Sequence, residues 1–128
     1  MQFTRAGLRV LHQSVAGQLV ATAATDDTTL VTVRNANYTI YIQKIVVWIT
    51  TDAAQSWSFE DSNGYQIAKV PASPGVSTRW EFDFGERGIP LGENKNFVLN
   101  TSAPGLAGSI VWEGYQKQSS TMAQASTN

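Results

Sequence analysis

A short segment that alternates aromatic and charged residues constrains the fold of this chain most strongly. The run Thr78-Arg79-Trp80-Glu81-Phe82-Asp83-Phe84 has an aromatic residue at every second position and charged residues between them. Successive side chains leave a β-strand on opposite faces, so this period of two predicts a strand with one buried face and one solvated face. We therefore expect the three aromatic side chains to point into a core, and Glu81 and Asp83 to point outward.

Other segments add strand and turn signals. The longest apolar run extends from Tyr38 to Thr51, and the parity of its apolar positions changes near Gln43-Lys44. Such a phase change predicts a β-bulge, or a strand that passes from one packing environment to another. The Asn-Gly pair within Asp61-Ser62-Asn63-Gly64 is typical of a type I′ turn and predicts a hairpin there.

Segments of this kind recur along the chain and define its architecture. About eight or nine short strands are separated by turn signals roughly every 8 to 12 residues, and no long segment keeps a helical period. One such signal, Ser14-Val15-Ala16-Gly17, indicates a hairpin or a short connection. The pattern predicts an all-β fold: a single antiparallel β-sandwich, jelly-roll-like, with extended N- and C-terminal arms. We expect residues 1–13 to form an N-terminal arm or first strand, residues 14–115 the sandwich, and residues 116–128 a polar C-terminal arm.

The composition argues against several classes of protein. A chain of 128 residues is long enough for one domain, and without cysteine it can form neither disulfides nor cysteine-based metal sites. The net charge is −1 and the nine basic residues are scattered, so we expect no nucleic-acid partner. No run approaches the roughly 18 apolar residues of a membrane span, and Met1-Gln2-Phe3-Thr4-Arg5 lacks the apolar core of a signal peptide. We therefore expect a soluble protein with no membrane contact and no export signal.

Charged residues make up only 15% of the chain, and small polar residues are abundant. Because charge is depleted at the cores of protein interfaces, this composition suits extended contact with another protein. It suits an ordinary all-β surface equally well.

Residues that could carry catalysis or bind a metal are sparse. His12 is the only histidine, and no Gly-x-Ser-x-Gly elbow accompanies it, so we expect no nucleophilic catalysis. The carboxylates of Glu81, Asp83 and Glu113 leave open a hydrolase that uses Glu81 and Glu113. Asp61-Ser62-Asn63-Gly64 matches the start of a calcium loop but lacks the later ligands of that motif, and a hairpin turn explains it fully. We expect no catalytic residue, no cofactor and no metal.

The aromatic residues raise a different possibility. Four tryptophans and four tyrosines in a small β-domain could form a carbohydrate-binding face, where exposed rings stack on sugars. Parity assigns Trp57, Trp80 and Trp112 to core faces, whereas Trp48 has the opposite parity to its apolar neighbours. Trp48 is therefore expected on an outer face, at a seam between the sheets or at a subunit contact, and the same alternatives hold for Tyr41 and Tyr115. The full set of candidate interface residues is Phe3, Arg5, His12, Tyr41, Trp48, Tyr115 and Met122.

The carboxy-terminal half resembles a known group of proteins. It contains Gly88-Ile89-Pro90-Leu91, then Asn96-Phe97-Val98-Leu99-Asn100-Thr101-Ser102, then Gly108-Ser109-Ile110-Val111-Trp112. A Gly-x-Pro-Leu turn, a short apolar strand and a final strand after a glycine-rich turn make this region similar to the closing strands of small virion proteins of tailed bacteriophages. The amino-terminal quarter and the polar tail lie outside the resemblance.

The resemblance implies a function as well as a fold. Proteins of this group are jelly-roll-like or related β-sandwiches that decorate capsids as cement proteins, form dimers or trimers, and bridge neighbouring capsid subunits. It implies a non-enzymatic structural protein of the virion, assembled in the host cytoplasm, that binds the major capsid protein or another virion protein as a homo-oligomer. No catalytic residue or cofactor comes with it. A carbohydrate- or receptor-binding sandwich at the tail or head is the alternative.

Overall fold

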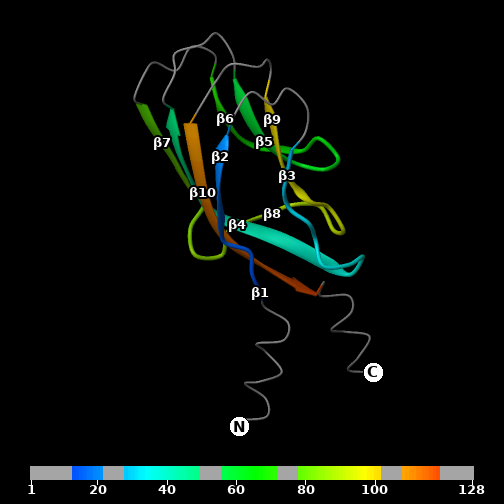
Figure 1. Ribbon diagram of the computed structural model, residues 1–128. Coiled ribbons are helices and arrows are strands. Elements are labelled where there is room, and N and C mark those ends of the chain that lie inside the picture. Colours follow the sequence, from blue (N-terminus) through cyan, green and yellow to red (C-terminus); the bar gives the residue numbers. More distant parts are fainter. Residues whose placement is uncertain (1–12, 22–27, 50–55, 72–77, 102–107, 119–128) are drawn as a thin grey trace, which may run out of the picture.

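The computed structural model describes residues 13–21, 28–49, 56–71, 78–101 and 108–118, and the regular structure in these ranges is β-strand throughout (Figure 1). None of these residues belongs to a helix that could span a membrane. The strands are β1 (Gln13–Ser14), β2 (Gly17–Ala21), β3 (Thr28–Val31), β4 (Tyr38–Ile49), β5 (Trp57–Asp61), β6 (Gln66–Val70), β7 (Thr78–Asp83), β8 (Ile89–Pro90), β9 (Phe97–Thr101) and β10 (Gly108–Gln118).

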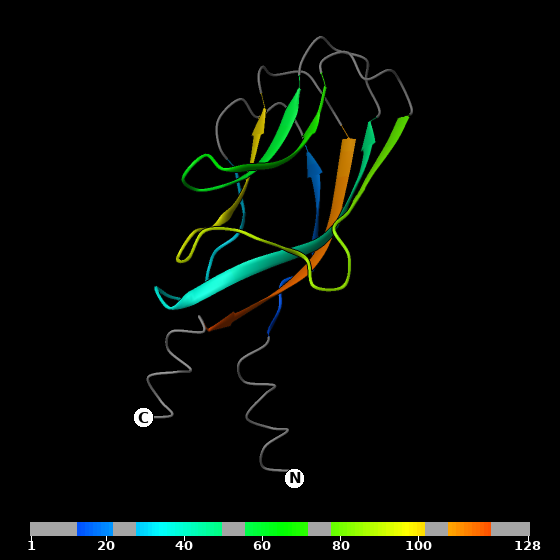
Figure 2. The same cartoon turned by 180° about the vertical axis from the view of Figure 1, so that it is seen from behind.

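These strands form two antiparallel sheets that enclose the core (Figures 1 and 2). In sheet A, β10 and β4 lie at the centre. β1 and β2 pair with the outer edge of β10, and β7 and β8 pair with the outer edge of β4. Sheet B has the order β3-β9-β5-β6. The central strands of sheet A thus belong to distant parts of the chain.

The pairing of the strands is nested. β2 pairs with β10, β3 with β9, β4 with β7, and β5 with β6, so each early strand meets a late one around the central β5–β6 hairpin. Neighbouring strands along the chain mostly belong to different sheets, and the chain crosses repeatedly between the two layers. This nested antiparallel arrangement in two sheets is that of a jelly roll. It confirms the jelly-roll-like sandwich expected from the sequence.

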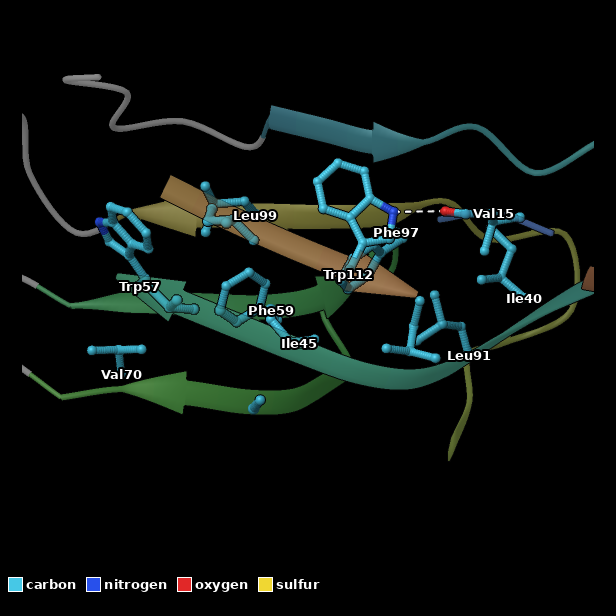
Figure 3. Close-up of a cluster of buried hydrophobic side chains, with 14 of the residues drawn as sticks. Val15, Ile40, Ile45, Trp57, Phe59, Val70, Leu91, Phe97, Leu99 and Trp112 are labelled. Atoms are coloured by element: carbon cyan, nitrogen blue, oxygen red, sulfur yellow. Dashed lines mark hydrogen bonds between the residues drawn. The ribbon is translucent and has the colours of Figure 1, made fainter. Parts of the chain in front are cut away.

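The core lies between the sheets and is filled mainly by alternating residues of β4, β5, β9 and β10 (Figure 3). The rings of Phe59 and Phe97 stack with their centroids 6.1 Å apart, and Trp112 meets Phe97 edge-on at 6.0 Å. Trp57 is fully buried near the opposite end of the cluster. Each fully buried side chain of this size contributes roughly 1.5–3 kcal/mol relative to exposure.

The expected parity of the alternating segment is confirmed. Trp80, Phe82 and Phe84 pack against the core, whereas Glu81 and Asp83 are exposed. The three aromatic side chains are only partly buried, because β7 is an edge strand and has no further strand beside it to complete their cover.

A β-bulge divides β4 into two halves. Glu113 of β10 lies opposite Lys44, but the next residue, Gly114, lies opposite Ile42, so Gln43 has no partner across the ladder. The bulge lets the apolar residues on both sides of it point inward. This confirms the phase change that the sequence places at Gln43-Lys44.

β1 and β2 are two parts of one interrupted edge strand. Both pair with β10, and the backbone N–H of Val15 in the link between them donates to the carbonyl of Gly114 at 3.0 Å. The chain therefore does not turn back between residues 14 and 17. The hairpin alternative for this segment is wrong, and the short connection is confirmed.

β10 continues to Gln118, so the sandwich includes residues 116–118. The side chain of Gln116 is buried, and its Oε1 accepts a hydrogen bond of 2.9 Å from the backbone N–H of Arg34. This contact ties the end of β10 to the connection between β3 and β4. The expected arms lie outside the described residues, apart from these ends of β1 and β10.

The β5–β6 hairpin differs from the expected turn type. The backbone N–H of Asp61 donates to the carbonyl of Tyr65, and that of Gly64 donates to the carbonyl of Asp61, both at 2.9 Å. Gly64 has a φ of 88°, but Asn63 does not have a positive φ. A type I′ turn needs positive φ at both central residues, so that expectation is wrong, and the hairpin has a longer loop that ends in a left-handed glycine.

The carboxylate of Asp61 is the physical reason for this turn. The side chain is buried, and its Oδ1 accepts from the backbone N–H groups of Asn63 at 2.8 Å and Tyr65 at 3.0 Å. Its Oδ2 accepts from the N–H of Gly92 at 3.1 Å. Both oxygens are thus used by backbone donors, which accounts for this acidic residue by turn structure rather than by calcium.

Candidate protein interface

Exposed apolar residues gather on the outer face of sheet A. Within the described ranges, the exposed large apolar side chains are Trp48, Tyr65 and Val111, and two of them, Trp48 and Val111, lie on this face, each 47% exposed. Val46 is half-buried directly opposite Val111 on the neighbouring strand. We call Trp48, Val46 and Val111 the outer patch. An exposed apolar cluster is informative, because polar side chains usually occupy the solvated face of a sheet.

A series of contacts between charged side chains restricts the orientation of Trp48. The guanidinium of Arg79 lies 5.6 Å from the centroid of the indole ring. Arg79 Nη2 is 2.8 Å from Glu81 Oε1, and Lys44 Nζ is 3.1 Å from Glu81 Oε2. A cation above an indole is attracted to the ring, so Trp48, Arg79 and Glu81 restrict one another.

The same contacts keep Glu81 ionised. The hydrogen bond from Lys44 and then that from Arg79 lower the pKa of Glu81 below its ordinary value of 4.5, and local desolvation opposes them only in part. A glycosidase needs one carboxyl that stays protonated as a general acid, which requires a raised pKa. Glu81 has the opposite shift and so could serve only as the ionised carboxylate. Glu113 lies two strands away across β4 and in a different row, opposite Lys44, whereas Glu81 lies opposite Val46. This geometry gives the carboxylate hydrolase no support.

A shallow hollow borders the outer patch on the side of β2. It has a volume of about 320 Å³ and is lined by Ala16, Gly17, Lys44, Val46, Val111 and Glu113, among others. The hollow is large enough to receive apolar side chains of another protein.

Tyr41 and Tyr115 form a second aromatic cluster beyond the bulge. Their rings stack with centroids 4.9 Å apart at an interplanar angle of 7°, and Lys117 Nζ lies 5.1 Å from the centre of the Tyr41 ring. The hydroxyl of Tyr115 donates to the carbonyl of Arg87 at 2.7 Å. Burial, and then the neighbouring Tyr41, raise the pKa of Tyr115, while Arg87 acts in the opposite direction. Much of the surface of both rings is thus used within the chain.

The outer face of sheet B is different in character. Ser58 is buried there, and its hydroxyl lies 2.7 Å from Glu60 Oε2 and 2.9 Å from Gln66 Oε1. Polar side chains satisfy one another on that face, whereas the outer patch of sheet A leaves apolar surface uncovered.

The candidate residues from the sequence are thus divided. Trp48 is exposed at the centre of the outer patch, Tyr41 and Tyr115 contact each other elsewhere on the same face, and Phe3, Arg5, His12 and Met122 lie outside the described residues. Within the described ranges, no group of histidine, cysteine, aspartate or glutamate side chains is placed to hold a metal ion. Val111 and Arg79 were not among the candidates. The parity of Val111, between the inward-facing Ile110 and Trp112, is the signal that could have identified it.

Comparisons with known proteins place this chain in no family. No family model matches it, and no curated protein matches its sequence. Similar solved structures include the virus-like particle of extra small virus from the giant freshwater prawn Macrobrachium rosenbergii, at 10% identity over 84% of this chain and 80% of that chain, with a TM-score of 0.40. Another is a Bacillus endospore appendage from a family of disulfide-linked pili, at 7% identity, with 84% and 88% covered and a TM-score of 0.44.

A further similar structure is the coat protein dimer of Tobacco streak virus, at 14% identity over 86% of this chain and 88% of that chain, with a TM-score of 0.36. Similarities at this level assign no function. The jelly-roll assignment rests on the strand pairing described above, and the function must be argued from the surface.

Proposed function

We propose that this chain is a non-enzymatic structural protein of a virion, and that it acts as a capsid decoration, or cement, protein of a tailed bacteriophage. The observation that carries the proposal is the outer patch, where Trp48, Val46 and Val111 offer apolar surface beside charged residues. An aromatic anchor surrounded by polar and charged groups is the usual organisation of a protein interface. The resemblance of the carboxy-terminal half to small phage virion proteins supplies the biological setting.

The held orientation of Trp48 favours contact with protein. Arg79 and Glu81 restrict the indole before any partner arrives, so less side-chain entropy is lost on binding. A rigid sandwich with such a patch can associate with protein without changing its fold. In this proposal the partner of the protein as a whole is the major capsid protein or another virion protein. Contacts at more than one point bridge neighbouring capsid subunits and add interface area to the shell.

The terminal segments supply further points of attachment in this proposal. Residues 119–128 consist largely of small polar residues, with Met122 as the one large apolar side chain. Segments of this composition do not form a core alone, but they can wrap extended surfaces when they become ordered on a partner. Phe3, Arg5, His12 and Met122 are the side chains proposed to make these contacts.

Purified particles test the proposed function. The protein is expected to co-purify with virions through a density gradient, at a copy number in fixed proportion to the major capsid protein, measured by quantitative mass spectrometry. Recombinant protein is expected to rebind to particles that lack it. Its absence from virions produced in cells that express it would contradict the proposal.

A carbohydrate- or receptor-binding module is the second candidate function, and the exposure of Trp48 favours it. However, Arg79 already lies over the indole, which makes the ring a poorer platform for a sugar than an uncovered one. Binding on a glycan array that is lost in Trp48→Ala and kept in Tyr65→Ala would support this second function instead.

A further inference from the structure

The outer patch is organised in rows across β10 and β4. Residues of the two strands that lie opposite each other have complementary properties: one row joins a small and a large side chain, one joins two apolar side chains, and one joins opposite charges. The rows are Ser109 with Trp48, Val111 with Val46, and Glu113 with Lys44. Adjacent strands are about 4.8 Å apart, so each row is compact.

A two-fold axis along the strands, between β4 and β10, turns these rows into contacts between two copies. Rotation about this axis keeps each residue in its row and exchanges the two strands. Trp48 of one copy then faces Ser109 of the other, and Lys44 faces Glu113 of the other. Every contact occurs twice, as an isologous interface requires.

The charges on this face fit the two-fold arrangement. Glu113 is exposed and forms no ion pair within the described part of the chain, whereas Lys44 is paired with Glu81. In the two-fold arrangement, Glu113 gains Lys44 of the second copy as a partner. Glu81 of one copy then faces β2 of the other copy. The residue of β2 that lies opposite Val111 is Gln18, which is uncharged. No like charges are opposed in these rows.

The shapes also fit. Trp48 is the largest projecting side chain of the patch, and it meets the small Ser109 across the axis. The hollow beside Val111 receives Val46 and the aliphatic part of Lys44 from the second copy. Two aligned sheets packed in this way resemble the aligned packing of sheets within a sandwich.

We infer that the outer patch binds a second copy of this chain and forms a two-fold dimer through sheet A. The dimer deepens the proposed function. It rests on the proposed function in one respect, since both treat the outer patch as a surface that contacts protein. A dimer carries every other capsid-binding surface twice, and two linked attachment points bind more tightly than one. The dimer is thus the bridging unit.

Sedimentation equilibrium of the full chain, without particles, tests the dimer. The wild type is expected to have the mass of a dimer. Trp48→Ala is expected to raise the dissociation constant about thirtyfold or more, as for the loss of a hot-spot residue. Tyr65→Ala is the matched control and is expected to leave the dimer unchanged, because Tyr65 is 53% exposed but lies on the β5–β6 hairpin, away from the patch.

A charge exchange tests the two-fold geometry itself. Glu113→Lys and Lys44→Glu each place like charges opposite each other across the axis, and each is expected to weaken the dimer about tenfold or more. The double variant restores opposite charges across the axis and is expected to bind more tightly than Lys44→Glu alone, although the Lys44–Glu81 pair within each chain stays lost. Thermal unfolding of every variant separates a loss of association from a loss of folding.

The outcomes distinguish the dimer from the proposed function. A wild type that stays monomeric up to its solubility limit, or a folded double variant with no recovery, would overturn the dimer. Monomeric protein that still occupies particles at a fixed copy number would overturn the dimer while leaving the decoration role intact. Dimers that never associate with particles would support the dimer and overturn the decoration role.

Discussion

The indole N–H of Trp112 donates a hydrogen bond of 2.7 Å to the carbonyl oxygen of Val15, inside the molecule (Figure 3). Val15 belongs to the link between β1 and β2, so this bond fixes the interrupted edge strand to β10. Gly17, at the start of β2, lies against the same ring, and a Cβ at that position would collide with it. Trp112 therefore supports both the core and the edge of the sheet that carries the outer patch.

Replacing Trp112 by Phe is expected to lower the free energy of unfolding by about 1–3 kcal/mol more than the smaller ring alone explains, because the buried carbonyl of Val15 loses its donor. Trp57→Phe is the matched control. Trp57 is also buried, but its indole N–H has no hydrogen-bond partner in the described structure. Urea unfolding measures the difference between the two variants, and equal losses would show that the Trp112 bond contributes nothing.

Asp61→Ala is expected to destabilise the fold by on the order of 2–4 kcal/mol, because backbone N–H groups of the hairpin and of Gly92 lose their acceptor. Asp83→Ala removes a similar turn contact, to the N–H of Gly85, at an exposed site. That variant is expected to cost well under half as much in the same unfolding experiment. A mild Asp61→Ala variant would indicate that water replaces the carboxylate.

The ion pairs of Glu81 are expected to dissolve in acid. Because its folded-state pKa lies below the ordinary value of 4.5, its contribution to stability is complete above that value and is lost as the pH falls through the folded-state pKa. Carbon-13 NMR of the carboxyl carbon is expected to give a midpoint below 4.5, and Lys44→Met is expected to raise it. A midpoint unaffected by Lys44→Met would argue against the pair in solution.

Deletion of residues 119–128 is expected to leave the sandwich folded, because β10 ends at Gln118 and Gln116 keeps its bond to the backbone of Arg34. The same deletion is expected to weaken attachment to particles, because these residues are proposed to contact the capsid. Thermal unfolding and co-sedimentation with particles measure the two effects separately. A truncated protein that binds particles like the full chain would remove the C-terminal arm from the account.

Local periodicity predicted much of this structure. The alternation at residues 78–84 and the phase change at Gln43-Lys44 both follow from the side chains of single strands, and both are confirmed. The exposure of Trp48 follows in the same way. The predicted turn type was wrong, because the buried carboxylate of Asp61 accepts from the backbone of the loop as well as from Gly92, and the rule for Asn-Gly pairs does not consider such an acceptor.

The arrangement of the outer patch could not be predicted without the register between the strands. Trp48 and Arg79 are far apart in the sequence and become neighbours only because β4 pairs with β7. Val111 and Val46 meet for the same reason, across β10 and β4. Such nested pairing between distant strands leaves no trace in the period of any one strand, so the sequence could name Trp48 but not its surroundings.

Co-sedimentation of purified protein with particles that lack it tests the central claim most directly, namely that the outer patch, through the dimer that it forms, is needed for tight attachment of this chain to a capsid. Wild-type protein and Tyr65→Ala are expected to pellet with the particles to saturation at the same copy number. Trp48→Ala, folded to the same extent by thermal unfolding, is expected to lose about tenfold or more in affinity. Equal binding by Trp48→Ala and Tyr65→Ala, or no binding by the wild type, would contradict the account.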